Sequence, residues 1–287
     1  ADDALPGFIT KMQRQYFKMN LLTYWNDAMK TSFSMMLSHH LALESLKPWH
    51  HKNKNSRIMD EVKETVIYEN AFDKTQEEWS AEMREDWVME GKGIAECGGG
   101  YLSLRSEIFT VPRERDGHFN FWLKREFPAD VALEWEFQYP EPGNEGLAIM
   151  MWAARGRNGE DIFDPGVPPR KGEVMSDMHS GAINCYHTSY IARGRKEANL
   201  RKNYGFHLVA HGHDLSTVSL PDEWHTVRLV QYHDTITLLF DGKESYRYFD
   251  DGTAGGPPIG TGGKFGFRQQ NNLYRGEYRN FRVYRLQ

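Results

Sequence analysis

The stretch from Gly159 to His213 concentrates side chains that can transfer protons and hold anions. It contains five histidines and many arginines and lysines, with little uninterrupted strand pattern. Imidazole titrates near neutral pH and is the commonest proton-transfer group in enzymes. The planar guanidinium of arginine clamps a carboxylate through two parallel hydrogen bonds. Because so long a loop is uncommon in a compact domain and is usually functional, we expect the functional site here.

Three of these histidines have a spacing that metal sites also use. His207, His211 and His213 would lie on one face of a strand, because side chains two residues apart point the same way. Zinc sites do use three histidines, but a catalytic zinc would also need a general base for its bound water. The spacing alone is a weak signal. We therefore expect no metal and no cofactor.

The same stretch also carries carboxylates. Glu160, Asp161 and Asp164 could serve as the paired acids of a glycoside hydrolase, which needs one carboxyl on each side of the scissile bond. The other interpretation is a turn before Pro165, in which aspartate side chains accept backbone N–H bonds. Cys185 lies near His187 in the sequence, but nothing in its surroundings indicates an activated thiolate.

The elements that must position these residues change type along the chain. Gly7 is the only glycine among the first ninety residues, and the other 25 of the 26 follow Glu90. In residues 5–46 apolar positions recur at three- and four-residue steps, which predicts two amphipathic helices that end before Pro48. Residues 1–56 are thus predicted to be a helical extension with a polar linker. Its apolar faces would pack on the main domain or on a second copy of the chain, as a homodimer.

Residues 57–287 are predicted to form an all-β sandwich. From about Thr65 the hydrophobic period falls to two, and short runs alternate with turns rich in glycine, proline, aspartate and asparagine. Ten such runs argue for a sandwich of two sheets. The predicted strands are residues 101–105, 118–124, 131–139, 147–153, 204–211, 224–232, 235–241, 245–249, 264–269 and 277–284.

The order of the closing strands resembles concanavalin-like β-jelly rolls, in which one sheet is concave and forms a carbohydrate-binding groove. Several motifs resemble the YesU-like family, whose members have that fold and include proteins encoded with rhamnogalacturonan-degrading enzymes. The resemblance covers about residues 67–285 and leaves out the helical extension. The motifs are Gly-Glu-Asp-Ile-Phe-Asp-Pro at 159–165, His-Ser-Gly-Ala-Ile-Asn at 179–184, Asn-Leu-Arg-Lys at 199–202, Gly-Phe-His-Leu at 205–208 and Gly-Phe-Arg-Gln at 266–269.

This resemblance implies an acidic saccharide as substrate, and a groove with histidine, tyrosine and arginine suits β-elimination from a uronic acid as the reaction. Elimination needs a base, an acid for the leaving oxygen and donors that neutralise the carboxylate. The leaving group would be a sugar in a polysaccharide lyase or water in an oligosaccharide dehydratase. We assign catalysis to His179, Tyr190, His187 and Arg201, with His179 and Tyr190 as the acid/base pair, and substrate binding to Asn184, Lys202, His207, Arg268 and Gln269.

Each assignment has a structural alternative. Neighbouring residues on a strand point to opposite faces, so only one of Arg201 and Lys202 can face the groove. The same limit applies to Arg268 and Gln269. A non-catalytic carbohydrate-binding protein would suit the 13% aromatic content, although the tryptophans in the strand-like runs could simply fill the core.

The composition of the chain argues against several other partners and kinds of site. A net charge of -5 gives no basic field for nucleic acid, and no run approaches the roughly 18 apolar residues of a membrane span. Cys97 and Cys185 are too few for a disulfide framework or a zinc ribbon. The first residues, Ala1 to Ala4, fit a mature chain after signal removal as well as a trimmed one. We expect a periplasmic or secreted protein, with the cytoplasm as the alternative.

Overall fold

The computed structural model describes residues 62–108, 117–139, 146–170, 172, 183–192, 194–203, 205–218, 222–270, 273 and 275–287. Val62–Gln287 forms one compact unit. The predicted helical extension, residues 1–56, lies outside the described residues, as does His179. No helix in the described ranges is long and apolar enough to cross a membrane.

In the described chain, one sheet contains eight antiparallel strands. Its order is β13-β12-β11-β6-β15-β4-β3, and β1 pairs with β15 beside this path. The long strand β15 therefore joins β1, β4 and β6. The strands are β1 (Glu64–Asn70), β3 (Gly93–Gly98), β4 (Tyr101–Ser106), β6 (Val131–Gln138), β11 (His225–Tyr232), β12 (Thr235–Phe240), β13 (Lys243–Phe249) and β15 (Gly276–Leu286).

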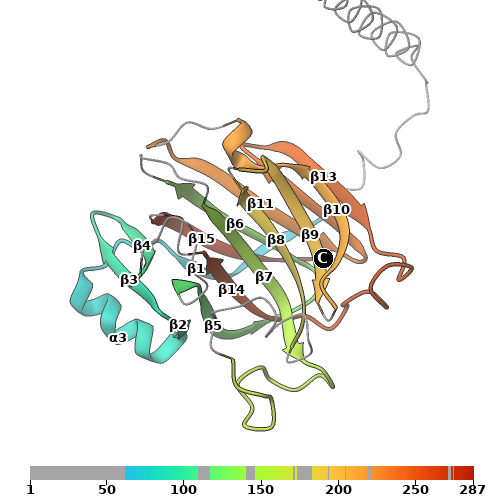
Figure 1. The fold of residues 1–287 in the computed structure, drawn as a ribbon, viewed down its shortest axis with the longest axis horizontal. Helices are drawn as coiled ribbons and strands as arrows, with labels where there is room; N and C mark the ends of the chain where they lie inside the picture. The colour runs from blue at the N-terminus through green and yellow to red at the C-terminus, as the bar shows by residue number, and fades with distance from the viewer. Residues whose placement is uncertain are drawn as a thin grey trace, which may run out of the picture. The chain divides into compact units, whose positions relative to one another are not determined.

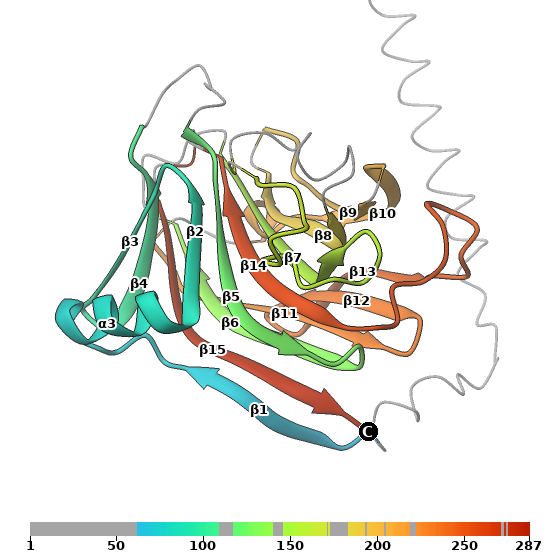
Figure 2. The same cartoon turned by 90° about the horizontal axis from the view of Figure 1, so that it is seen from below.

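The second described sheet contains seven antiparallel strands in the order β10-β9-β8-β7-β14-β5-β2. Figures 1 and 2 show it as a separate layer, with β5 and β14 facing the layer of β15 and β6. The strands are β2 (Trp87–Gly91), β5 (Phe119–Phe127), β7 (Leu147–Gly156), β8 (Ile183–Ala192), β9 (Glu197–Asn203), β10 (His207–His213) and β14 (Gly263–Gln269). The predicted all-β sandwich of two sheets is thus confirmed.

The helix α3 (Gln76–Asp86) precedes β2 and begins at a capping box. The side chain of Thr75 accepts from the backbone N–H of Glu78, and the carboxylate of Glu78 accepts from the backbone N–H of Thr75. Trp79 on this helix is fully buried and meets Phe121 of β5 with ring centroids 6.2 Å apart. The helix therefore closes the end of the sandwich next to β2. A short 3₁₀ helix, η2 (Leu215–Thr217), follows β10.

Aromatic side chains fill the space between the sheets. Trp135 of β6 meets Phe267 of β14 at 5.3 Å between ring centroids and Tyr190 of β8 at 5.4 Å, both edge to face. Phe281 of β15 stacks on Phe265 at 4.8 Å. Such rings supply most of the apolar area that the sandwich buries.

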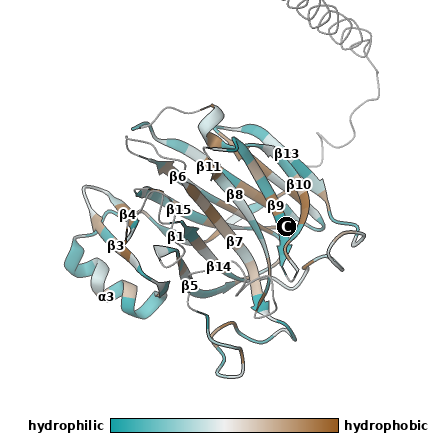
Figure 3. Ribbon diagram, in the orientation of Figure 1, coloured by the Kyte–Doolittle hydropathy of each residue, from teal (hydrophilic) through white to brown (hydrophobic). Residues whose placement is uncertain are grey.

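Two strands, β8 and β9, lie where a long loop was predicted, whereas β10 overlaps the predicted strand at residues 204–211. The segment Gly159–His213 contains β8, β9 and β10. β8 gives no alternating signal because nine of its ten residues are buried, with only Asn184 partly exposed. Its neighbour β7 is also buried on both faces and carries the brown of apolar residues in Figure 3. Strands covered on both sides lose the period of two that a half-exposed strand shows.

Candidate functional site

The face of the seven-stranded sheet that points away from the other sheet carries a second, separate cluster of buried apolar side chains; we call it the outer face. The pairing register places one residue from each of five strands in a continuous row across the sheet. Residues directly opposite each other on adjacent strands share a face and are in contact range. The row consists of Trp122, Gly266, Met151, His187 and Arg201.

The centre of the row is a glycine because a side chain there would clash with Trp122. A Cβ on Gly266 would lie 2.5 Å from the indole of Trp122. The indole therefore lies against the glycine, and the outer face between Trp122 and Met151 is apolar. His187 and Arg201 follow Met151 in the row, so an imidazole and a guanidinium stand at the end of an apolar surface.

Phe206 packs over both of these polar groups. Its ring stacks on the His187 imidazole with centroids 5.5 Å apart and planes 25° apart. The guanidinium carbon of Arg201 lies 4.1 Å from the centre of the same ring, and Arg201 Nη1 donates to the Phe206 carbonyl at 3.1 Å. Phe206 has a φ of 59°, which is uncommon for a residue other than glycine. The turn between β9 and β10 thus holds an aromatic ring over the His187–Arg201 pair.

The charge of Arg201 is not neutralised by the protein residues that the structure describes. Arg201 forms no ion pair among them, and it donates its hydrogen bond to the neutral carbonyl of Phe206. Burial, followed by the like charge of Arg195, lowers the pKa of the Arg201 guanidinium. Partly buried cations usually have a carboxylate partner. Arg201 is therefore suited to hold an anionic group of a ligand.

The other end of the outer face is covered by the chain after β7. Arg170 and Glu90 form an ion pair of 2.6 Å with side chains 3% and 9% exposed, and Glu90 also accepts from Trp122 Nε1 at 2.8 Å. Arg268 donates to Asn120 Oδ1 at 2.7 Å and to the carbonyl of Gly172 at 2.6 Å. Arg268, predicted to bind substrate, lies on the outer face but is fully buried under this segment. It therefore offers no exposed clamp.

Tyr190 and Gln269 occupy the opposite face, inside the sandwich. The hydroxyl of Tyr190 lies 2.8 Å from that of Tyr278, and Gln269 Nε2 donates to the same Tyr278 hydroxyl at 2.7 Å. All three side chains are fully buried, and burial raises the pKa of Tyr190 well above its ordinary value. Tyr190, predicted as one member of the acid/base pair, and Gln269, predicted to bind substrate, therefore lie in the interior of the sandwich and not on the outer face.

Lys202 also points inward. Its ammonium forms a buried ion pair of 2.9 Å with Asp250, and neither side chain is more than 1% exposed. Lys202, predicted to bind substrate, is therefore held inside the protein by Asp250. Arg201 and Lys202 lie on opposite faces of β9, as expected for neighbours on a strand, and Arg201 is the one on the outer face.

The remaining predicted binding residues lie at the rim. Asn184 is partly exposed and pairs with Arg155 near the end of β7. His207 lies opposite Lys202 in the register and against Gly255, whose added Cβ would come within 3.0 Å of the His207 Cβ. His207, predicted to bind substrate, therefore lies on the Lys202 side of the sheet, away from His187.

The three histidines His207, His211 and His213 do not all lie on one face of β10. A register shift between Leu208 and Ala210 places His207 opposite Lys202 but His211 opposite Asn199, whose side chains leave opposite faces of β9. Within the described ranges, no group of three or more histidine, cysteine, aspartate or glutamate side chains could hold a metal ion.

The carboxylates after β7 form the turn contacts that were the alternative to a hydrolase site. Asp161 accepts from the backbone N–H of Phe163 at 2.8 Å and Asp164 from that of Gly166 at 2.8 Å. The hydrogen bond from the Asn158 amide, together with backbone N–H bonds, lowers the pKa of Glu160. These carboxylates therefore stabilise a surface turn.

The reactivity of Cys185 is also decided by its surroundings. Burial raises the pKa of the Cys185 thiol to about 12, and the Asn203 amide donates to its sulfur at 3.4 Å. Such a thiol stays protonated and is a poor nucleophile. Phe206, by contrast, is a site residue that the sequence analysis missed. Its only signal was its place in the Gly-Phe-His-Leu motif, next to a glycine and directly before a strand.

Comparisons with known proteins agree with this architecture. The family described as "Domain of unknown function (DUF1961)" matches residues 65–283. The uncharacterized protein YesU of Bacillus subtilis (strain 168) is 35% identical over 208 residues, which are 70% of this chain and 89% of that protein. A crystal structure of a B. subtilis protein of unknown function with a galectin-like fold has a TM-score of 0.66 and 32% identity, covering 78% of this chain and 98% of that one.

A more distant structure shares the fold alone. The carbohydrate recognition domain of Emp46p, in a mutant form, has a TM-score of 0.51 and 14% identity, covering 77% of this chain and 97% of that one. The sequence resemblance to the YesU-like family is confirmed, because both the family model and the B. subtilis relative cover most of the sandwich. The chain belongs to the DUF1961 family.

Proposed function

We propose that this chain is a carbohydrate-active protein that binds a carboxylate-bearing saccharide on the outer face, beside His187 and Arg201. The observation that supports it most strongly is the partly buried Arg201 guanidinium, which has no carboxylate partner in the described chain and lies across from an imidazole. A carboxylate would meet that guanidinium through two parallel hydrogen bonds. The sandwich fold is shared with a carbohydrate recognition domain, which supports a sugar as the molecule that bears this carboxylate.

The reaction that suits this pair is β-elimination from a uronic acid. A base removes the proton on C5, the bond from C4 to oxygen breaks, a double bond forms between C4 and C5, and the leaving oxygen takes up a proton. Negative charge spreads into the carboxylate as the proton leaves, so a guanidinium bound there stabilises the transition state. In this proposal Arg201 holds the carboxylate and His187 transfers the C5 proton. His179, predicted as one member of the acid/base pair, would then donate a proton to the leaving oxygen.

The leaving group distinguishes two versions of this lyase. A departing sugar makes the protein a polysaccharide lyase, and departing water makes it an oligosaccharide dehydratase. The rhamnogalacturonan association of the family stays a prediction that supports acidic glycans as the first substrates to test. Phe206 would contribute an aromatic surface for a sugar ring, because saccharides pack their C–H faces against such rings.

Binding without chemistry is the second candidate. The observation that favours it is the burial of His187, which is only 3% exposed beneath the ring of Phe206. A proton-transfer group must come within hydrogen-bond reach of the substrate. Turnover therefore requires Phe206 to move aside, whereas a sugar could bind against Phe206 and Arg201 without that movement.

The deciding experiment measures the ultraviolet absorbance of an unsaturated uronate after incubation with ulvan, rhamnogalacturonan and glucuronan oligosaccharides. We expect a rise for one of them, and a loss of about 100-fold or more in rate with His187→Ala, the usual size of a general acid–base contribution. His233→Ala is the matched control, because His233 is 72% exposed and lies between β11 and β12 of the other sheet.

The other outcomes assign the alternatives. Calorimetric binding without any unsaturated product would select the binding protein. A new saturated reducing end that disappears with Glu160→Gln would select a glycoside hydrolase. Neither binding nor turnover with any acidic saccharide would end the proposal.

A further inference from the structure

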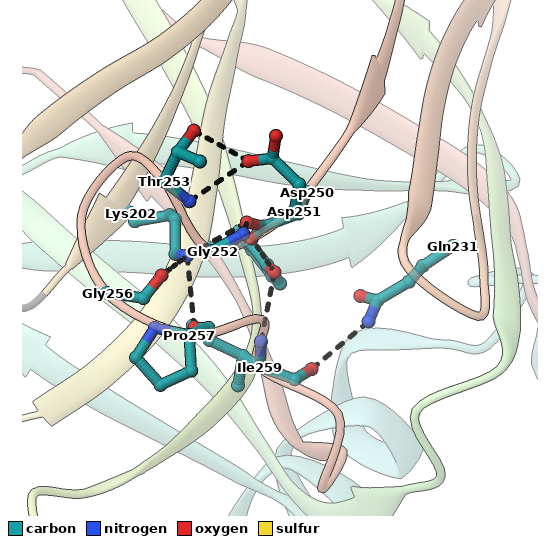
Figure 4. Close-up of polar contacts among 10 residues, drawn as sticks. Lys202, Gln231, Asp250, Asp251, Gly252, Thr253, Gly256, Pro257 and Ile259 are labelled. Carbon is teal, nitrogen blue, oxygen red and sulfur yellow. Dashed lines mark hydrogen bonds and ion pairs between the residues drawn. The ribbon is translucent and has the colours of Figure 1, made fainter.

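The ammonium of Lys202 is enclosed by oxygens of one loop. Lys202 Nζ lies 3.1 Å from Asp250 Oδ1, 2.9 Å from Asp250 Oδ2 and 3.0 Å from the carbonyl of Pro257, and it also donates to the carbonyl of Gly256. Figure 4 shows the lysine reaching between the carboxylate and the turn that carries the two carbonyls. We call these four oxygens the oxygen cage.

The cage belongs to a loop that is fastened only at a few points. It connects β13 to β14, and Asp250 is fully buried at its start. Tyr186 donates to Asp250 Oδ2 at 2.5 Å and accepts from the backbone N–H of Ile259 at 3.0 Å. The backbone N–H of Gly252 donates to Asp250 Oδ1 at 3.1 Å. The cage therefore forms where both ends of the loop meet the sheet.

The charge and the distances of the cage select one class of cation. It holds a single carboxylate and two neutral carbonyls, so one positive charge balances it. Calcium takes six to eight oxygens at about 2.3–2.6 Å, and magnesium needs octahedral oxygens at about 2.0–2.1 Å. Distances of 2.9–3.1 Å instead suit an ammonium group or a large monovalent ion.

We infer that the oxygen cage is a monovalent-cation site whose occupant is supplied covalently by Lys202. The tethered ammonium holds the two ends of the loop together without any dissolved ion. The protein should therefore be indifferent to the choice of monovalent salt, whereas a chain without the lysine ammonium should bind a free ammonium-type ion or K⁺ at the same oxygens. This inference is independent of any saccharide bound on the outer face.

A merely structural ion pair would behave differently. Removing one partner of a buried pair leaves an uncompensated charge and destabilises the fold. Such a destabilised variant would have the same melting temperature in every monovalent salt at equal ionic strength. A specific site, by contrast, stabilises the folded state progressively as its ligand concentration rises above the dissociation constant. Rescue that depends on the identity of the cation thus separates the two interpretations.

The test compares melting temperatures of the full chain in methylammonium, potassium and tetramethylammonium chloride at equal ionic strength. We expect Lys202→Ala to melt below the wild type and to recover as methylammonium or potassium rises. Tetramethylammonium, which cannot donate hydrogen bonds and is too large for the cage, should give no recovery. The wild type should have the same melting temperature in all three salts.

Two controls keep the result specific. Lys202→Met fills the space without a charge, and Lys202→Ala with Asp250→Asn removes the negative charge of the cage; neither should recover. Equal melting of Lys202→Ala in the three salts would overturn the inference. If that variant folds poorly, its refolding yield from denaturant replaces the melting temperature, and a yield unaffected by methylammonium and potassium would overturn it equally.

Discussion

Arg201 and Lys202 are neighbours in β9, yet their cationic groups lie on opposite sides of the seven-stranded sheet. The Arg201 guanidinium lies beneath the Phe206 ring on the outer face, whereas the Lys202 ammonium is enclosed by the Asp250 loop on the other side. One cation has its carboxylate inside the protein, and the other has none in the described chain. The strand β9 would therefore contact the proposed ligand through Arg201 on one face, and it stabilises the fold through Lys202 on the other.

This arrangement predicts a charge-specific role for Arg201. Arg201→Met should weaken binding of an acidic oligosaccharide by about 10-fold to 100-fold, because hydrogen bonds to charged groups contribute about 1.5–3 kcal/mol. Binding of a neutral oligosaccharide should change little. Isothermal titration calorimetry measures both.

The matched control for that variant is Arg282→Met. Arg282 is an arginine on the other sheet, 44% exposed and 3.9 Å from Glu69. An equal loss of affinity in both variants, or an equal loss for neutral and acidic ligands, would remove Arg201 from the site.

A second prediction concerns the hydroxyl of Tyr190. Tyr190→Phe deletes only its contact with Tyr278, which still accepts from Gln269. We expect a loss of about 1 kcal/mol in the free energy of unfolding, typical of one buried hydrogen bond, and unchanged ligand binding and turnover. Urea denaturation and the ultraviolet assay check the two parts. A large loss of turnover in a well-folded variant would restore Tyr190 as a catalytic residue.

Burial alone did not decide which strands the sequence predicted. β11 and β12 were found within one residue of their ends, and so was β14, which is buried at every residue. β8, which has no alternation because both of its faces are buried, was missed, and so were the partly exposed strands β1, β2 and β3. The helical spacing predicted for residues 5–46 lies outside the described residues, so it stays a prediction.

The site was harder to predict because it depends on non-local register. Alternation alone indicated that Arg201 and Lys202 diverge, but only the pairing of β8 with β9 shows that Arg201 meets His187. A register shift beside Tyr190 and another in β10 change which residues share a face. Bulges of this kind follow from tertiary packing and leave little trace in the sequence.

Alkaline pH should weaken the fold in part through Cys185. Burial raises the pKa of its thiol from 9.0 to about 12. Between these values the folded protein keeps the proton that the unfolded chain loses, so the stability present below pH 9 declines as pH rises toward about 12, by at most ~1.4 kcal/mol per pH unit. Cys185→Ala removes the ionisable group.

The measurement is urea denaturation between pH 8 and pH 11. The variant should lose stability less steeply with pH than the wild type, whatever its absolute stability. Parallel curves for both proteins would show that the thiol has the same pKa in the folded and unfolded chains. That result would contradict the effect of burial on the Cys185 pKa.

The last prediction concerns the segment that covers Arg268. Glu90→Gln removes the charge that balances Arg170, and both side chains are at most 9% exposed. Breaking a buried pair in this way costs about 3–5 kcal/mol, because a charge is left without compensation. Glu126→Gln is the matched control, since Glu126 pairs with Arg155 at 2.6 Å but is 40% exposed, and exposed pairs contribute about 0–1 kcal/mol. Urea denaturation should separate the two variants clearly. Equal losses would mean that the segment is not held on the outer face by the Glu90–Arg170 pair.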